Sequence, residues 1–76
     1  MSQTQFAKEQ FTSLVVRVAQ AVEPTLDDYR QWLVTQAALS VWKRWGMKAS
    51  LAKVAKLMRG QDDPRAVDLG RMLAAA

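Results

Sequence analysis

The residues of this sequence whose types and spacing could support chemistry are basic, and they gather between positions 43 and 59. Six of the eleven lysines and arginines lie in that segment, and all seven acids lie outside it. The six are Lys43, Arg44, Lys48, Lys53, Lys56 and Arg59. Such a cluster can neutralise several phosphates, which supplies the salt-dependent, sequence-independent part of affinity for nucleic acid. An ordinary solvated helix face is the alternative interpretation of the same residues.

Spacing links three of these residues more firmly than the others. Lys53, Lys56 and Arg59 recur every third position, on the side of a predicted short helix that lies opposite its apolar residues. The other three basic residues precede this helix. Whether they join it depends on the angle between this helix and the one before it, which the sequence does not fix. A shared binding face is therefore predicted for Lys53, Lys56 and Arg59. The other three basic residues belong to it only if the angle between the two helices brings them close.

The C-terminal part of the chain has the outline of a helix-turn-helix. Two short helices, over residues 50–59 and 63–74, flank a turn that contains Gly60. In this interpretation the second helix would read DNA with its outer face. That face carries three charged residues, Arg65, Asp68 and Arg71. Acids at the start of this helix and its mixed charge speak against DNA reading, and a plain helical hairpin fits the same residues.

Tryptophans suggest a second kind of surface on a long predicted helix over residues 25–45. At about 100° per residue, most apolar side chains of this helix share one face, whereas Trp32 and Leu39 lie on another, in line with Gln36. A helix with two apolar faces is either central in a bundle or presents a binding patch. The candidate partner-binding residues are Trp32, Gln36, Leu39 and Trp42.

Trp42 and Trp45 also flank two basic residues, Lys43 and Arg44. This arrangement allows cation–π contacts, stacking on nucleic-acid bases or a position at a membrane interface. A membrane-surface helix over residues 42–59 is therefore a third hypothesis. The acids that follow that segment disfavour it, and no uncharged run is long enough to span a bilayer.

Catalysis is not expected from this composition. The sequence has no histidine and no cysteine, so it lacks the commonest general base, the strongest nucleophile, the ligands of structural zinc and any disulfide. Its two carboxylate pairs, Asp27 with Asp28 and Asp62 with Asp63, stand where helices are predicted to begin, and capping accounts for them. We therefore predict a non-enzymatic protein with no cofactor, metal or small-molecule substrate.

The elements that must position these residues are helices. A chain of 76 residues, half of them hydrophobic, fits one domain over residues 1–76. Proline and glycine at positions 24, 46, 60 and 64 divide it into helices over residues 4–22, 25–45, 50–59 and 63–74. The prediction is an all-α compact bundle of about four helices, two longer N-terminal ones and then the helix-turn-helix-like hairpin.

Particular residues are expected to set the ends and the packing of these helices. Thr25, Ser50 and Asp63 are the predicted N-caps of the second, third and fourth helices. Asp28 would complete a shortened capping box with Thr25. Gly70 lies inside the last helix, where it costs about 1 kcal/mol relative to alanine, and close approach of a neighbouring helix would account for it.

The net charge of +4 and a pI near 10 add to the expectation of an acidic partner. The leading hypothesis is a small nucleic-acid-binding regulator that contacts DNA rather than RNA through its basic C-terminal half. The alternative is a small helical protein-interaction module, of the accessory kind found in phages and mobile elements, that inhibits or modulates a larger partner with an acidic surface. A homodimer is compatible with either. The N-terminal residues do not resemble a signal peptide, so a cytoplasmic location is expected.

Overall fold

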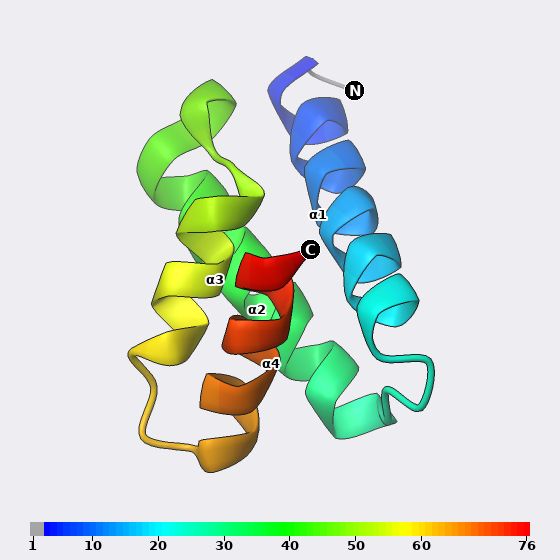
Figure 1. The fold of residues 1–76 in the computed structure, drawn as a ribbon. Coiled ribbons are helices and arrows are strands. Elements are labelled where there is room, and N and C mark those ends of the chain that lie inside the picture. Colours follow the sequence, from blue (N-terminus) through cyan, green and yellow to red (C-terminus); the bar gives the residue numbers. More distant parts are fainter. Residues whose placement is uncertain (1–2) are drawn as a thin grey trace.

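The computed structural model describes residues 3–76 and confirms the predicted all-α bundle (Figure 1). Its elements are α1 (Gln3–Val22), α2 (Asp28–Trp45), the short 3-10 helix η1 (Gly46–Lys48), α3 (Leu51–Arg59) and α4 (Pro64–Ala75). The described part of the chain contains no strand. Its extents are 35 × 22 × 20 Å.

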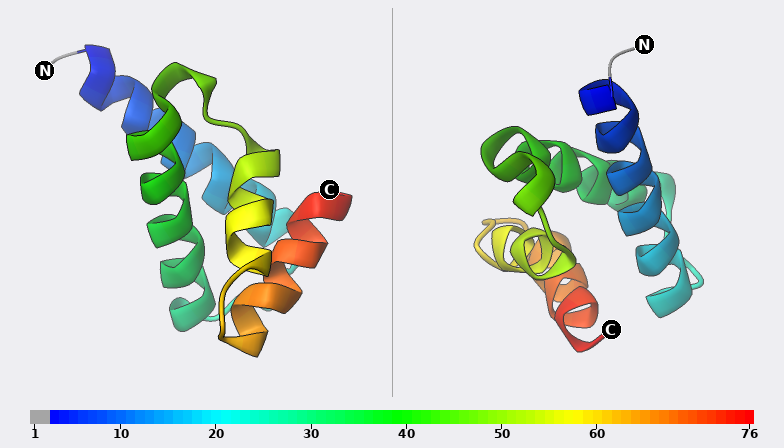
Figure 2. Two further views of the ribbon diagram at one scale, coloured as in Figure 1. Left: turned by 90° about the vertical axis from the view of Figure 1, so that its left-hand side faces the viewer. Right: turned by 90° about the horizontal axis from the view of Figure 1, so that it is seen from above.

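The helices alternate in direction, so that the chain runs down α1, up α2, down α3 and up α4 in the view of Figure 1. Helix α2 is central, because it contacts α1, α3 and α4, while α3 and α4 form the most extensive helix pair (Figure 2). This topology brings the α1–α2 loop and the α3–α4 turn to one end of the bundle. The end of α2, η1 and the start of α3 lie at the opposite end.

All four helices contribute to one core. The central helix buries the face that its apolar spacing predicts, through Val34, Ala37, Ala38 and Val41. The largest fully buried side chains from its neighbours are Val15, Val54, Met58, Leu69 and Leu73. Burial of each such side chain contributes about 1.5–3 kcal/mol, so this core is the main stabilising element of a chain without disulfides.

The predicted N-cap of the second helix is wrong by two residues. Helix α2 begins at Asp28, and Asp27 is its N-cap, with the Asp27 carboxylate accepting the backbone N–H of Arg30 at 2.7 Å. Thr25 donates its hydroxyl and its backbone N–H to the Glu23 carboxylate instead, so the expected capping box with Asp28 is absent. Local hydrogen bonding within the loop therefore occupies the residue that the sequence pattern favoured as a cap.

The other two predicted caps are confirmed. Ser50 accepts the backbone N–H of Lys53 at the start of α3, and Asp63 accepts that of Arg65 at the start of α4, where Pro64 takes the first helical position. At the other end of α2, Gly46 has a φ of 56°, a backbone angle that residues other than glycine rarely adopt. This glycine turns the chain out of α2 into η1.

Gly70 has the role expected of a small residue between two helices. A Cβ at this position would lie 2.8 Å from the Arg59 backbone nitrogen and 2.9 Å from the Ala55 carbonyl oxygen. The backbones of α3 and α4 therefore meet directly at Gly70. This contact fixes the distance and direction of α3, which carries part of the candidate site.

Candidate nucleic-acid interface

Three of the six clustered basic residues share one concave surface. Arg44 lies near the end of α2, and Lys53 and Lys56 lie on α3; together with Trp45 they line a groove of about 460 Å³ between the two helices. We call this surface the basic groove, and its complete lining is Arg44, Trp45, Lys53, Lys56, Leu57, Gly60 and Gln61. No acid is among these residues.

Two cations lie against the ring of Trp45. The Arg44 Cζ is 5.0 Å and the Lys53 Nζ is 4.9 Å from the ring centroid, distances at which cation–π attraction operates. The Lys53 Nζ also donates to the backbone carbonyl oxygen of Lys48 at 3.0 Å. The turn at Gly46 folds η1 back so that this carbonyl faces the first turn of α3. The ammonium of Lys53 is thus held at a fixed place in the groove.

The remaining clustered basic residues lie outside the basic groove. Arg59 is exposed, and its Cγ would be 2.9 Å from a Cβ at Gly70, so it lies toward α4. A step of three residues falls about 60° short of a full turn, so Arg59 points about 120° away from Lys53. Lys43 and Lys48 are exposed and do not line the groove. The structure therefore joins Arg44, rather than Arg59, to Lys53 and Lys56.

The outer face of α4, predicted as a DNA-reading surface, is partly engaged with α2. The Arg65 Cζ lies 4.2 Å from the centroid of the Tyr29 ring. An oxygen of Asp68 is 4.0 Å from the guanidinium of Arg30, which also lies 3.8 Å from Glu23. Arg71 is exposed. Two of the three residues of this face therefore contact the bundle itself.

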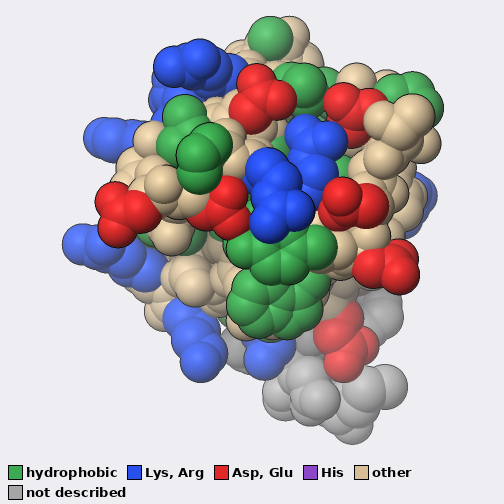
Figure 3. Space-filling view, turned by 90° about the horizontal axis from the view of Figure 1, so that it is seen from below, with side chains coloured by type: hydrophobic (Ala, Val, Ile, Leu, Met, Phe, Trp, Pro, Cys, Tyr) green, Lys and Arg blue, Asp and Glu red, His purple; other side chains and the backbone are tan. Residues whose placement is uncertain are grey.

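A hydrogen bond ties the start of α2 to the start of α4. The Tyr29 hydroxyl donates to the Asp63 carboxylate at 2.6 Å. This bond is the main cause that lowers the pKa of Asp63 below its ordinary value, with the backbone N–H of Arg65 adding to it. The same bond raises the pKa of Tyr29. On this end of the molecule, acidic side chains lie around basic side chains and an apolar patch (Figure 3).

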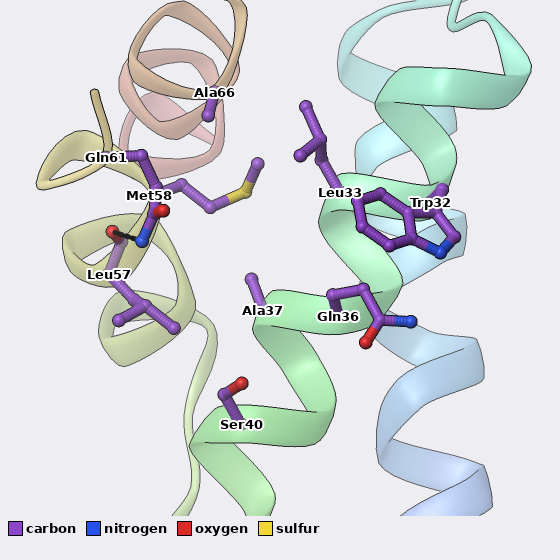
Figure 4. Close-up of a pocket in the computed structure, with 9 residues that line it drawn as sticks. All are labelled: Trp32, Leu33, Gln36, Ala37, Ser40, Leu57, Met58, Gln61 and Ala66. Carbon is purple, nitrogen blue, oxygen red and sulfur yellow. Dashed lines mark hydrogen bonds between the residues drawn. The ribbon is translucent and has the colours of Figure 1, made fainter. Parts of the chain in front are cut away.

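Trp32 borders a second, smaller groove. Its ring is 56% exposed and stacks on Tyr29 at a centroid distance of 6.2 Å. The Trp32 groove, of about 200 Å³, lies between α2 and the α3–α4 hairpin, with Met58 and Ala66 facing it (Figure 4). Its lining is Trp32, Leu33, Gln36, Ala37, Ser40, Leu57, Met58, Gln61 and Ala66. Leu57 and Gln61 border both grooves, so the two surfaces adjoin.

Of the four predicted partner-binding residues, Trp32 and Gln36 line this groove and the other two do not. Leu39 is partly buried and lies outside it. Trp42 is only 8% exposed and packs against Phe11 of α1, with ring centroids 6.0 Å apart. The expectation that Trp42 lies on an exposed patch is therefore corrected, because α1 covers this side of α2. Of the two C-terminal tryptophans of α2, Trp45 is the one that faces the basic residues.

Sequence reasoning missed three groove residues, Leu57, Gly60 and Gln61. Leu57 follows Lys53 by four positions, so it lies on the same side of α3 as the lysines, and this spacing was a usable signal. Gln61 belongs to a turn, and turn residues carry no periodicity that would indicate a direction. The bridge from Arg30 to Glu23 and Asp68 was also missed, because it crosses the α1–α2 loop and joins α2 to α4, which no helical spacing indicates.

The sequence matches no protein-family model, and neither curated proteins nor solved structures give a significant match. Among residues 3–76, no helix combines the length and the apolar character needed to cross a membrane. No three carboxylates of the described residues gather closely enough to hold a metal ion.

Proposed function

We propose that this chain is a small nucleic-acid-binding protein with a regulatory role, such as control of transcription, and that it contacts DNA through the basic groove. One observation carries the proposal: Arg44, Lys53 and Lys56 converge around Trp45 on a concave surface that no carboxylate lines. Each cation can neutralise a phosphate and release its counterions. An aromatic ring among cations is a common arrangement in nucleic-acid-binding proteins.

The surroundings of the groove support the same proposal. Lys43 and Lys48 are exposed at the same end of the bundle, where they add to the positive potential around Arg44 and Lys53. By contrast, the outer face of α4 has its Arg65 over Tyr29 and its Asp68 near Arg30. The contact surface proposed here is therefore the α2–α3 side of the bundle and not the outer face of α4.

Charge reversal in the groove tests this function. A chain with Lys53→Glu and Lys56→Glu is expected to bind DNA at least about 10-fold more weakly than the wild type at low salt, because two phosphate contacts become repulsive. Fluorescence anisotropy with labelled DNA at two salt concentrations measures the loss. Absence of DNA binding by the wild type at low salt, or equal binding by the variant, would overturn the proposal.

The control variant changes the same charge elsewhere. Lys8→Glu with Arg17→Glu reverses two basic residues on α1, far from the groove along the chain, and is expected to keep more of the affinity than the groove variant. Arg71→Glu separately tests the outer face of α4. A larger loss from Arg71→Glu than from the groove variant would move the contact to that helix. Circular dichroism confirms that each variant is folded.

The exposed ring of Trp32 favours a second candidate function, a protein-interaction module. A large aromatic side chain beside an apolar groove is a typical anchor point for a protein partner. Co-purification from the native cell with nuclease treatment separates the two functions. A protein partner that survives nuclease and is lost with Trp32→Ser, yet retained by the Lys53→Glu, Lys56→Glu chain, would favour this second function.

A further inference from the structure

We infer that the basic groove selects unpaired nucleotides, with a base stacked on Trp45 and the flanking phosphates on Arg44, Lys53 and Lys56. This inference rests on the proposed function and narrows its ligand to single-stranded nucleic acid. It differs from the expectation of a helix that reads duplex DNA. The shape of the groove, the setting of Trp45 and the free groups of Gln61 support it.

The shape of the groove favours a flexible strand over a duplex. Its volume of about 460 Å³ is that of a site for a small molecule, and its walls are two helices, α2 and α3. A duplex keeps its base faces covered by stacking, so Trp45 could reach one only by opening the duplex at a cost in free energy. An unpaired base has exposed faces and can enter a concave site without that cost.

Trp45 is suited to receive a base. Its side chain is partly buried against the core, so its ring is held in place, while the rest of the ring lines the groove. The Arg44 Cζ and the Lys53 Nζ lie over the ring, 5.0 Å and 4.9 Å from its centroid, so a base that stacks on Trp45 must displace one of these side chains. Arg44 is exposed, so it can swing off the ring toward a neighbouring phosphate. Stacking on an aromatic ring accepts every base, because every base has a π-face. The groove is therefore expected to bind single strands with little sequence preference.

Gln61 and Gly60 complete the groove on the side of the α3–α4 turn. The Gln61 amide nitrogen donates to the Leu57 carbonyl oxygen at 3.3 Å, which uses one of its two N–H groups. Gln61 is an exposed residue, so its other N–H and its amide oxygen can bond the edge of a base. Gly60 also lines the groove. An acidic peptide would pair with the cations but would leave the ring of Trp45 without a planar partner.

Binding assays with three matched probes test this inference. The probes are a single-stranded oligothymidylate of about 12 nucleotides, an abasic strand of equal length and a duplex of equal length, all at one salt concentration. The oligothymidylate is expected to bind about 10-fold more tightly than either of the others, which corresponds to about 1.4 kcal/mol. An unlabelled acidic peptide is added as a competitor, and it is expected to compete less well than the unlabelled oligothymidylate.

Two variants show whether Trp45 supplies the difference. Trp45→Leu is expected to lower affinity for the single strand about 10-fold and to leave affinity for the duplex unchanged, whereas Trp45→Phe, which keeps a ring, retains part of the preference. Trp32→Leu is the matched control, because Trp32 lies on the same helix but outside the basic groove. In a Trp32→Phe chain, the emission comes from Trp45 and the buried Trp42. Binding of the single strand is expected to quench the Trp45 part of this emission, a readout that needs no substitution in the groove.

The outcomes separate this inference from the proposed function. Equal affinity for all three probes, lowered by the Lys53→Glu, Lys56→Glu change and unaccompanied by quenching, would overturn base stacking and leave nucleic-acid binding in place. Equal competition by the acidic peptide would also overturn the inference. Absence of binding to every probe at low salt would overturn both proposals. Should Trp45→Leu unfold the chain, the preference for the single strand and the quenching in the Trp32→Phe chain decide the question.

Discussion

Gly70 is the single residue on which the packing of α3 against α4 most directly depends. A Gly70→Ala change would place a methyl group 2.8 Å from the Arg59 nitrogen and 2.9 Å from the Ala55 carbonyl oxygen, both of which are backbone atoms that cannot rotate away. Overpacking of this kind costs about 1–3 kcal/mol, and the better helix propensity of alanine returns about 1 kcal/mol. We expect a net loss of up to about 2 kcal/mol in the free energy of unfolding, measured by urea denaturation.

Gly60 provides the matched control for this substitution. A Cβ at Gly60 would lie 3.5 Å from the Leu57 carbonyl oxygen, which is ordinary contact, and its φ of −87° is open to alanine. Gly60→Ala is therefore expected to leave stability unchanged or to raise it by about 0.4–1 kcal/mol through the unfolded chain. Equal effects of the two substitutions would show that the α3–α4 backbone contact is not the constraint at Gly70.

The Tyr29–Asp63 hydrogen bond makes the free energy of unfolding depend on pH in the acidic range. Because the pKa of Asp63 is lowered in the folded state, the contribution of this carboxylate is fully present above the ordinary pKa of aspartate, near 4. It is lost as the pH falls through the lower folded-state pKa. Tyr29→Phe removes the main cause of the shift, so the pKa of Asp63 is expected to rise toward its ordinary value in an NMR titration of the carboxyl group.

The stability of this variant gives the corresponding control. The difference in unfolding free energy between the wild type and Tyr29→Phe is expected to be largest near neutral pH and to shrink below about pH 4, as Asp63 becomes protonated in both chains. A difference that stays constant from neutral to acidic pH would show that the Tyr29 hydroxyl does not act through the ionised Asp63 carboxylate, because phenylalanine keeps the ring contacts with Trp32 and Arg65.

At the scale of helices, the structure differs from the sequence prediction at the start of α2, where Asp27 and not Thr25 is the N-cap. Asp27 accepts the N–H of Arg30, so Asp27→Ala is expected to destabilise the chain by about 1 kcal/mol in thermal or urea unfolding. Thr25→Ala removes only bonds to the exposed Glu23 side chain and is expected to cost less. A larger loss of stability from Thr25→Ala than from Asp27→Ala would show that Thr25, and not Asp27, caps the helix.

This helix start also shows what the sequence could and could not predict. The four helices, the face that α2 buries and the caps at Ser50 and Asp63 follow from local patterns, and all are confirmed. Thr25, Asp27 and Asp28 can each serve as a cap near the start of α2. Cap preference ranks aspartate above threonine, whereas the capping-box spacing to Asp28 favoured Thr25. The choice depends on which loop conformation lets Thr25 bond Glu23, a matter of geometry that no periodicity records.

The candidate site was harder to predict than the helices, because it depends on how they pack. Trp42 and Trp45 are three positions apart, yet α1 covers the first, and the second faces Arg44 and Lys53. A helical wheel of α2, at about 100° per residue, gives the directions of both side chains but does not show where α1 and α3 pack around this helix. For the same reason, the basic residues that share a groove come from two helices, and the regular spacing on α3 did not identify them.

At the scale of the whole molecule, the alternating helices place most of the acids at one end and most of the clustered basic residues at the other, although Arg30 and Arg65 lie among the acids. Asp27, Asp28, Asp62 and Asp63 lie at the end formed by the α1–α2 loop and the α3–α4 turn (Figure 3). The C-terminal end of α2, η1 and the start of α3 lie at the opposite end, with their basic residues. A polyanion that approaches this protein therefore meets attraction at one end and repulsion at the other, which orients the encounter.

The salt dependence of binding follows from the number of cations in the basic groove. Three cations, each worth a slope of about −0.7 for a single strand, predict that log K falls with log salt concentration at a slope of about −2. With Lys53→Glu and Lys56→Glu, only Arg44 remains, and the slope is expected to flatten to about −0.7 or less. A titration over several salt concentrations measures both slopes. A wild-type slope near zero would exclude phosphate neutralisation, and a slope steeper than about −4 would require that basic residues outside the groove also bind phosphates, because three contacts cannot release so many counterions.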